Sequence, residues 1–244
     1  MESFINFRRI RLAHRGLHDA VLDENSLGAF KSAVAHGYGI ELDVHLTKDG
    51  TLAVVHDGNL SRVANLDISI TAMTASDLAK TKLLLSGEAI PTLVQVLEVV
   101  QGKVPLLIEM KVDGAFDPAL PEGIIEALSD YPDDGNIAVQ SFNPYAMRWL
   151  RKNYPHRYPY GQLVSHDFEG QSRFTNFMFR TLLINLISRP LFTSMDVNYL
   201  PDKHIRRARR RGMNIICWTV DSDSKRQLAE READNYIFER IRPQ

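Results

Sequence analysis

"LAHRGLHDAVLDENSLGAFKSAVAHGYGIELDVHL", residues 12–46, is the stretch that decides the fold. It begins with a short apolar segment at 11–13, continues with a helical pattern at 26–35 and ends with a second apolar segment at 39–45. A strand, a helix and a second strand in this order form the unit of a parallel sheet, because parallel strands need a long crossover between them. We therefore expect these residues to form the first two strands of such a sheet.

The same alternation continues along almost the whole chain. Eight segments read as strands, at 11–13, 39–45, 105–111, 136–142, 160–164, 194–197, 214–220 and 235–238. Helical patterns fall between them, at 26–35, 93–100, 118–129, 145–153, 173–188, 202–211 and 222–232. Eight strands with intervening helices predict an α/β fold of the TIM (β/α)8 barrel type rather than an open doubly wound sheet.

Two irregularities interrupt this pattern. Asp49-Gly50 between two apolar runs predicts a tight hairpin that returns His56 toward the end of the second strand. The connection that follows is long, so we expect a small inserted segment at about 57–90. After 235–238 too few residues remain for a helix, which predicts a truncated eighth unit. We expect residues 1–244 to form a single domain.

The composition restricts the classes of partner. The chain has 29 basic and 30 acidic residues, a formal net charge of -1, so no global positive field favours nucleic acid. Cys217 is the only cysteine and lies in an apolar strand, where we expect a buried, unreactive thiol. Neither a secretory signal nor a run of about 18 apolar residues is recognisable, and we predict a cytoplasmic protein.

Acidic side chains gather where two predicted strands end. Because strand side chains alternate between faces, Glu41 and Asp43 point the same way, as do Glu109 and Lys111. Three carboxylates at one barrel mouth repel one another unless a cation lies between them, and oxygen ligands favour Mg²⁺ or Ca²⁺. The alternative is that these acids form salt bridges with Arg15 or Lys111.

Two histidines also end apolar runs. His14 closes the first strand and precedes Arg15-Gly16, and His56 follows the hairpin. Two imidazoles and a guanidinium beside a divalent cation suit phosphodiester hydrolysis, in which imidazoles move protons and positive groups hold the phosphate. His45 shares the face of Glu41 and Asp43, but we assign it no direct role.

Several short motifs along the chain together resemble those of a known enzyme family. The chain resembles the glycerophosphodiester phosphodiesterase family in AHRG at 13–16, ENS at 24–26, IELDVHLTKDG at 40–50, VVHD at 54–57, IPTL at 90–93, LIEMK at 107–111, QSF at 140–142 and WTV at 218–220. The resemblance implies a TIM barrel that hydrolyses small-molecule glycerophosphodiesters to an alcohol and glycerol 3-phosphate with one divalent cation. It leaves open whether this cation is Mg²⁺ or Ca²⁺.

The resemblance also implies a role for each site residue. The acid and base are His14 and His56, the metal ligands Glu41, Asp43 and Glu109, the phosphate clamps Arg15 and Lys111, the apolar wall Phe142 and Trp218, and the supporting residues Glu24 and Asn25. Simpler alternatives are that Asn25 caps the following helix and that the two aromatic residues pack in the core. Which histidine is the acid, and whether water or a substrate hydroxyl attacks, stays open.

The C-terminal end departs from the family pattern of threonine and aspartate followed shortly by proline. Phe238 and Glu239 occupy the first two of these positions. We expect this departure to affect closure of the barrel and the substrate pocket but to touch none of the proposed proton or metal groups.

Two further segments suggest other functions. Residues 174–192 read as an amphipathic helix whose Phe177, Met178, Leu182 and Ile184 could contact acyl chains, as in a lysophospholipase D-like enzyme at membranes. We favour packing of this helix on the barrel, without membrane association. The RRARRR run at 206–211 could bind nucleic acid or acidic lipid, but we favour a solvated helix end. The sequence gives no oligomeric state.

Overall fold

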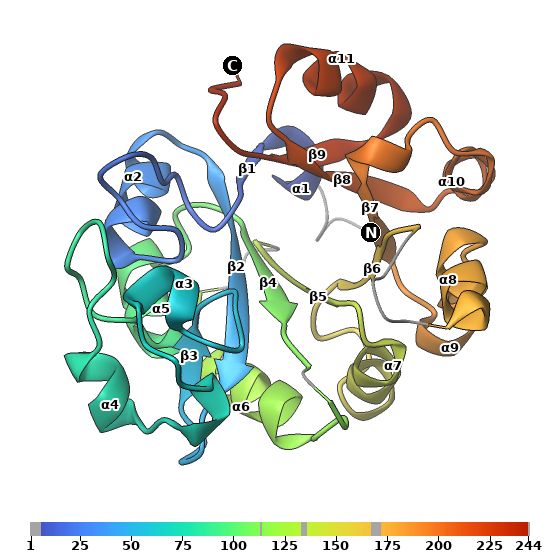
Figure 1. The fold of residues 1–244 in the computed structure, drawn as a ribbon. Helices are drawn as coiled ribbons and strands as arrows, with labels where there is room; N and C mark the ends of the chain where they lie inside the picture. The colour runs from blue at the N-terminus through green and yellow to red at the C-terminus, as the bar shows by residue number, and fades with distance from the viewer. Residues whose placement is uncertain (1–5, 113, 133–135, 167–171, 244) are drawn as a thin grey trace.

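The computed structural model describes residues 6–112, 114–132, 136–166 and 172–243, and it contains a closed barrel of eight parallel strands (Figure 1). Closure occurs where β1 pairs with both β2 and β9. The predicted TIM barrel is therefore confirmed. Its strands are β1 (Leu12–Ala13), β2 (Gly39–Leu46), β4 (Leu106–Met110), β5 (Ile137–Ser141), β6 (Tyr160–Val164), β7 (Phe192–Asp196), β8 (Asn214–Val220) and β9 (Asn235–Phe238).

Helices surround the strands because alternate strand residues are apolar and point outward. Ile40, Leu42 and Val44 of β2 belong to the large cluster that the helices cover, whereas Glu41 and Asp43 between them face the interior. The helices are α1 (Asn6–Arg9), α2 (Leu27–Ala35), α5 (Leu93–Val100), α6 (Ala119–Ala127), α7 (Pro144–Asn153), α8 (Arg173–Arg180), α9 (Asn185–Ser188), α10 (Lys203–Arg210) and α11 (Asp223–Glu232), with a 3-10 turn, η3 (Val197–Tyr199).

The barrel interior is filled by a second, smaller apolar cluster. Phe7 of α1 belongs to it, together with Leu107 of β4 and Phe192 of β7. Phe192 needs a small neighbour, since a Cβ atom on Gly161 would lie only 2.1 Å from its ring. Gly161 and Phe192 are partners in the pairing of β6 with β7, so β7 begins two residues before the predicted start.

The predicted hairpin and inserted segment are both present. β3 (Leu52–Val54) pairs antiparallel with the end of β2. The insertion that follows contains α3 (Ser61–Ala64), a 3-10 turn η2 (Ile70–Ala72) and α4 (Ala75–Lys80), and lies beside β3 in Figure 1. Its apolar residues form a small core of their own, and the Asp23 carboxylate ties it to the barrel by accepting a hydrogen bond from the backbone N–H of Ser86.

The prediction of one helix over 173–188 is wrong. The chain forms α8 and α9, separated by a turn in which Leu182 adopts a left-handed φ of 59°. Phe179 and Ile184 are both buried, and five residues of a continuous helix would place them roughly 140° apart. The turn lets both side chains face the barrel.

Among the described residues, no helix follows β9, as the sequence predicts. Among those residues, no helix combines the length and the apolar character needed to cross a bilayer.

Candidate active site

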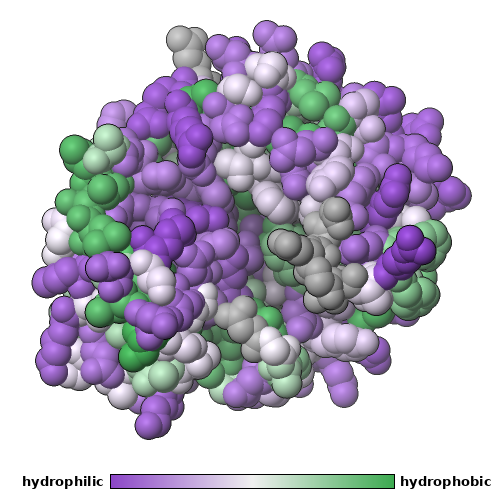
Figure 2. Space-filling model, in the orientation of Figure 1, coloured by the Kyte–Doolittle hydropathy of each residue, from purple (hydrophilic) through white to green (hydrophobic). Residues whose placement is uncertain are grey.

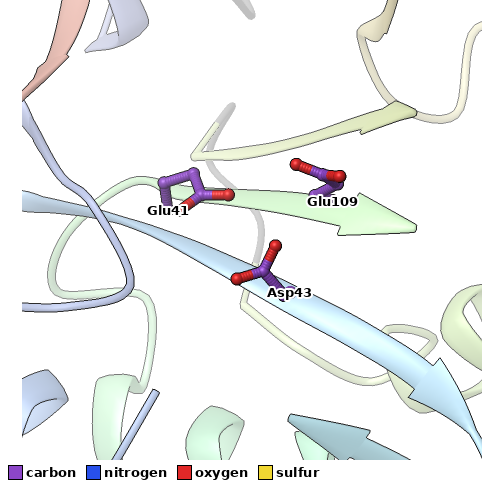
Figure 3. Close-up of side chains that lie close together, drawn as sticks. All are labelled: Glu41, Asp43 and Glu109. Carbon is purple, nitrogen blue, oxygen red and sulfur yellow. The ribbon is translucent and has the colours of Figure 1, made fainter. Parts of the chain in front are cut away.

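Three carboxylates converge inside the carboxyl end of the barrel. Glu41 and Asp43 extend from β2, and Glu109 extends from β4, where it pairs in register with Asp43 (Figure 3). One oxygen from each lies within 4.8 Å of the others, and all three residues are buried. The convergence predicted from strand alternation is therefore present.

Two positively charged side chains lie against these acids but do not neutralise their combined negative charge. Lys111 Nζ lies 2.8 Å from Glu109 Oε1 and 3.1 Å from Asp43 Oδ1, and Arg15 Nε lies 3.5 Å from Asp43 Oδ2. The salt bridges that we gave as the alternative to a metal site are therefore present as well. Three carboxylates face two cations, and Arg15 also pairs with Glu24, so the cluster has an excess of negative charge.

The pKa values of the acids reflect this imbalance. Burial, followed by the charges of Asp43 and Glu109, raises the pKa of Glu41 well above its ordinary value. Burial also raises the pKa of Glu109. Although burial acts in the same direction on Asp43, the charges of Lys111 and Arg15 lower its pKa. A hard divalent cation fits this site because its donors are all carboxylate oxygens and its charge would offset the excess.

The turn after β1 aims the backbone at these acids. Arg15 and Gly16 both have left-handed φ angles, 53° and 82°, and the Arg15 N–H donates to Glu41 Oε2 at 3.1 Å. Glycine is needed at 16 because a Cβ atom there would lie 2.9 Å from the Phe30 ring. The AHRG motif thus supplies both a conformation and side chains.

His56 follows β3 and is oriented by its neighbour in the sequence. Its Nδ1 lies 2.7 Å from Asp57 Oδ1, and Asp57 Oδ2 accepts from Arg62 Nε at 2.6 Å. The ionised carboxylate accepts only, so Nδ1 carries the proton and Nε2 is the ring nitrogen that can accept one. Burial lowers the pKa of His56.

The network continues from His56 to the other side of the pocket. Glu24 receives hydrogen bonds from Arg62 and, at 2.7 Å, from Arg15 Nη1. Asn25 Nδ2 donates to Asp43 Oδ2 at 2.9 Å. Glu24 and Asn25 therefore lie where we expected supporting residues. The alternative that Asn25 caps the helix is wrong, since the cap of α2 is Ser26.

His14, directly after β1, has its own carboxylate partner. Glu239 Oε2 lies 2.7 Å from His14 Nδ1, and this hydrogen bond lowers the pKa of Glu239 to about 2. The expectation that the C-terminal departure would touch none of the proton or metal groups is wrong. The two residues are far apart in the sequence, but closure of the barrel between β1 and β9 places them side by side.

A cavity of about 100 Å³ unites these groups in the hollow at the centre of the face shown in Figure 2. Both histidines, Arg15, Lys111 and the three acids line it, as do Phe142 and Trp218, whose rings meet edge to face at 5.8 Å. All predicted residues except Glu24 and Asn25 thus line one cavity. These two lie behind it, bonded to Arg15 and Asp43.

Sequence reasoning missed Gln140 of β5, which also lines the cavity. Gln140 pairs in register with Glu109, so strand alternation was the signal that could have found it. Gln140 Nε2 and Trp218 Nε1 are buried N–H donors without a hydrogen-bond partner in the described part of the chain. The cavity thus combines a cation-deficient acid cluster with unsatisfied donors, a combination suited to a cation and an anion together.

The model of the glycerophosphoryl diester phosphodiesterase family matches residues 14–242. The chain belongs to this family. A putative glycerophosphodiester phosphodiesterase of Bacillus subtilis is 31% identical over 225 residues, which cover 86% of each protein. A glycerophosphodiester phosphodiesterase of Caldanaerobacter subterraneus is 37% identical over 153 residues, but the match covers 59% of this chain and 63% of that protein.

Two solved structures have the same fold. The glycerophosphodiester phosphodiesterase of Thermotoga maritima gives a TM-score of 0.72 at 29% identity and covers 94% of this chain and 93% of its own. An Oleispira antarctica phosphodiesterase, solved with the product sn-glycerol-3-phosphate, gives 0.81 at 21% identity, with coverage of 95% and 93%. The barrel of these structures is thus retained here.

His45, to which we assigned no direct role, also contacts a residue of the site. His45 is buried, and its Nε2 donates to the backbone oxygen of His56 at 3.0 Å. It lies on the neighbouring side of Lys111, outside the cavity that the two other histidines line. That it has no direct role stays a prediction.

Proposed function

We propose that this chain hydrolyses glycerophosphodiesters to an alcohol and glycerol 3-phosphate. The observation that carries the proposal is the convergence, in one small cavity, of the three acids with two imidazoles that each have a carboxylate partner. Membership of the family supports the substrate class. A cavity of about 100 Å³ suits a compact phosphate and glycerol group rather than a bulky ligand.

In this proposal, Glu41, Asp43 and Glu109 hold one divalent cation, Mg²⁺ or Ca²⁺. When bound, the cation supplies positive charge that offsets the excess carboxylate and polarises the phosphate. The support is the donor set itself, which consists of buried oxygen ligands with one negative charge more than Arg15 and Lys111 balance. The choice between the two ions stays a prediction.

The chain's own side chains then bind the diester and move protons. Arg15 and Lys111 hold the phosphate oxygens, Phe142 and Trp218 contact the carbon edge of glycerol, and Glu24 and Asn25 support Arg15 and Asp43. One imidazole takes the proton of the attacking hydroxyl, whether of water or of the substrate's glycerol, and the other protonates the departing alkoxide. Since burial lowers the pKa of His56, this imidazole is neutral near pH 7 and able to accept a proton.

A panel of glycerophosphodiesters, assayed with and without chelator for release of glycerol 3-phosphate, tests the proposal. We expect His14→Ala and His56→Ala each to lower turnover by about 10²-fold or more with the circular dichroism spectrum unchanged. His36→Ala is the matched control, because His36 is exposed and bonds only to its own helix among the described residues. Near-normal turnover of either site variant would remove that histidine from the mechanism.

The lysophospholipase D-like alternative gains no support from the relatives reported above, which are named for glycerophosphodiesters or as phosphodiesterases. Comparing glycerophosphocholine with lysophosphatidylcholine as substrates distinguishes the two activities. The single-domain organisation and the cytoplasmic location stay predictions.

A further inference from the structure

The outer wall of the barrel carries an apolar surface that the proposed reaction does not use. Large apolar side chains of α8, α9 and the segments that flank them remain exposed: Phe174 by 71%, Phe177 by 53%, Leu183 by 37%, Leu186 by 72% and Leu191 by 58%. We call these residues the α8–α9 surface. Single exposed apolar residues are ordinary, but a group of them within one short segment indicates an interaction site.

Packing on the barrel does not account for this surface. Phe179 and Ile184 already bury the inward side of the two helices, and α9 packs against α7. Of the residues that we expected to contact acyl chains, Ile184 is buried, Met178 and Leu182 are half-buried and Phe177 is exposed. The segment therefore has two apolar sides, and only one of them is covered.

Arginines border the same surface. A groove of about 540 Å³ lies between α8–α9 and α10, with Phe177 and Leu186 on one side and Arg207 and Arg211 on the other. The residues that line it include no aspartate or glutamate. The sequence likewise has no acidic residue from 172 to 195 or from 203 to 220.

The RRARRR run divides into two groups. Arg206 pairs with Glu232 at 2.6 Å, and Arg209 pairs with Asp234 at 3.1 Å, so these two arginines fasten α10 to the end of α11 and the residues after it. Arg207, Arg210 and Arg211 are exposed and form no ion pair within the described part of the chain. Of these three, Arg207 and Arg211 line the apolar groove, whereas Arg210 faces a neighbouring hollow beside Arg206 and Arg209.

This combination selects the partner. Exposed aromatic and aliphatic side chains next to unpaired arginines match the boundary between anionic lipid headgroups and acyl chains. Nucleic acid would use the arginines but leave the apolar side chains in water. A second copy of this chain would bring the same arginines together, and like charges repel.

We propose that the α8–α9 surface, with Arg207 and Arg211, docks this protein on anionic phospholipid bilayers. α8 and α9 lie on the outside of the barrel rather than over its centre (Figure 1). A bilayer held there leaves the carboxylate cavity open. The proposal stands independently of the reaction at that cavity, because none of the surface residues lines it.

Flotation of the full chain with vesicles tests the docking. Vesicles of phosphatidylcholine alone are compared with vesicles that contain equal parts of phosphatidylcholine and phosphatidylglycerol. We expect flotation only with the anionic vesicles and a decrease as salt is added, since screening weakens attraction to the surface. Failure to float with anionic vesicles at low salt overturns the proposal.

Paired variants locate the surface. Arg207→Glu combined with Arg211→Glu should reduce vesicle binding by about tenfold or more, and Phe177→Ser combined with Leu186→Ser should also reduce it. Arg148→Glu and Val94→Ser are matched exposed controls on α7 and α5 and should bind as the parent does. Equal loss in the controls, unchanged binding in the surface variants, or a dimer in solution that buries this surface would each refute the proposal.

Hydrolysis of a water-soluble glycerophosphodiester by the same variants separates this proposal from the proposed function. The surface variants should keep the parent rate in solution while losing vesicle binding. If the parent floats but hydrolyses nothing, the reaction is wrong and the docking stands.

Discussion

Glu239→Gln is the sharpest test of how the site handles protons. The substitution keeps the size of the side chain but removes the carboxylate that lies 2.7 Å from His14 Nδ1. The carboxylate accepts only, so it fixes the ring with its proton on Nδ1 and stabilises the positive charge that forms when the ring gains a second proton. The amide of Gln can donate as well as accept, and it carries no charge.

The magnitude follows from the contact. A hydrogen bond to a charged group contributes about 1.5–3 kcal/mol, and each 1.4 kcal/mol corresponds to about tenfold in rate. The side chains of His14 and Glu239 are 15% and 20% exposed, so screening by water favours the lower half of that range. We expect kcat to fall by about 10- to 30-fold, with KM nearly unchanged, because Glu239 does not line the cavity.

The assay measures kcat and KM for one glycerophosphodiester from pH 5 to pH 9. Glu239→Asp should recover part of the lost activity because it restores the charge, whereas Glu230→Gln, in an ion pair on α11, should have no effect. A merely structural role would lower thermal stability but leave the shape of the pH profile unchanged. Parent-like kcat across the whole pH range in Glu239→Gln would refute the positioning role.

Two further predictions concern the charges of the site. Glu41→Gln should abolish hydrolysis yet raise the melting temperature of the chelator-treated protein, because burial beside Asp43 and Glu109 makes an ionised Glu41 unfavourable without a cation. Scanning calorimetry with and without EDTA measures the melting temperature. A melting temperature below that of the parent contradicts the prediction. The His14–Glu239 pair lowers the pKa of Glu239 from 4.5 to about 2. The contribution of this pair to stability is therefore complete above pH 4.5 and is lost as the pH falls toward 2. The difference in unfolding free energy between the parent and Glu239→Gln, measured in urea, should shrink over that interval.

Much of the site could be predicted because it depends on short-range geometry. Alternation along β2 and β4 places Glu41, Asp43 and Glu109 on one side whatever the rest of the chain does, and parallel pairing brings the strands together. Asp57, which orients His56, is its neighbour in the sequence and lies in the quoted VVHD motif. These features need no knowledge of distant contacts.

The missed features depend on tertiary structure. Whether helix 173–188 continues or breaks depends on which side chains the barrel can bury. The left-handed turn at Leu182 contains no glycine that would have predicted it from the sequence. The division of the RRARRR run also depends on Glu232 and Asp234, which approach α10 only in the folded barrel. Periodicity and charge alone could not separate the arginines that form ion pairs from those that do not.

Closure of the barrel also orients the His14 side chain. Ala13 and Phe238 are partners in the parallel pairing of β1 with β9, and the His14 N–H donates to the Phe238 carbonyl at 2.9 Å. His14 directly follows β1 and Glu239 directly follows β9, so their side chains meet. The two imidazoles thus obtain their carboxylates in different ways, His56 from the adjacent residue and His14 from the far end of the chain. A chain that has not closed its barrel retains Asp57 beside His56 but lacks the partner of His14, so full activity requires a complete fold.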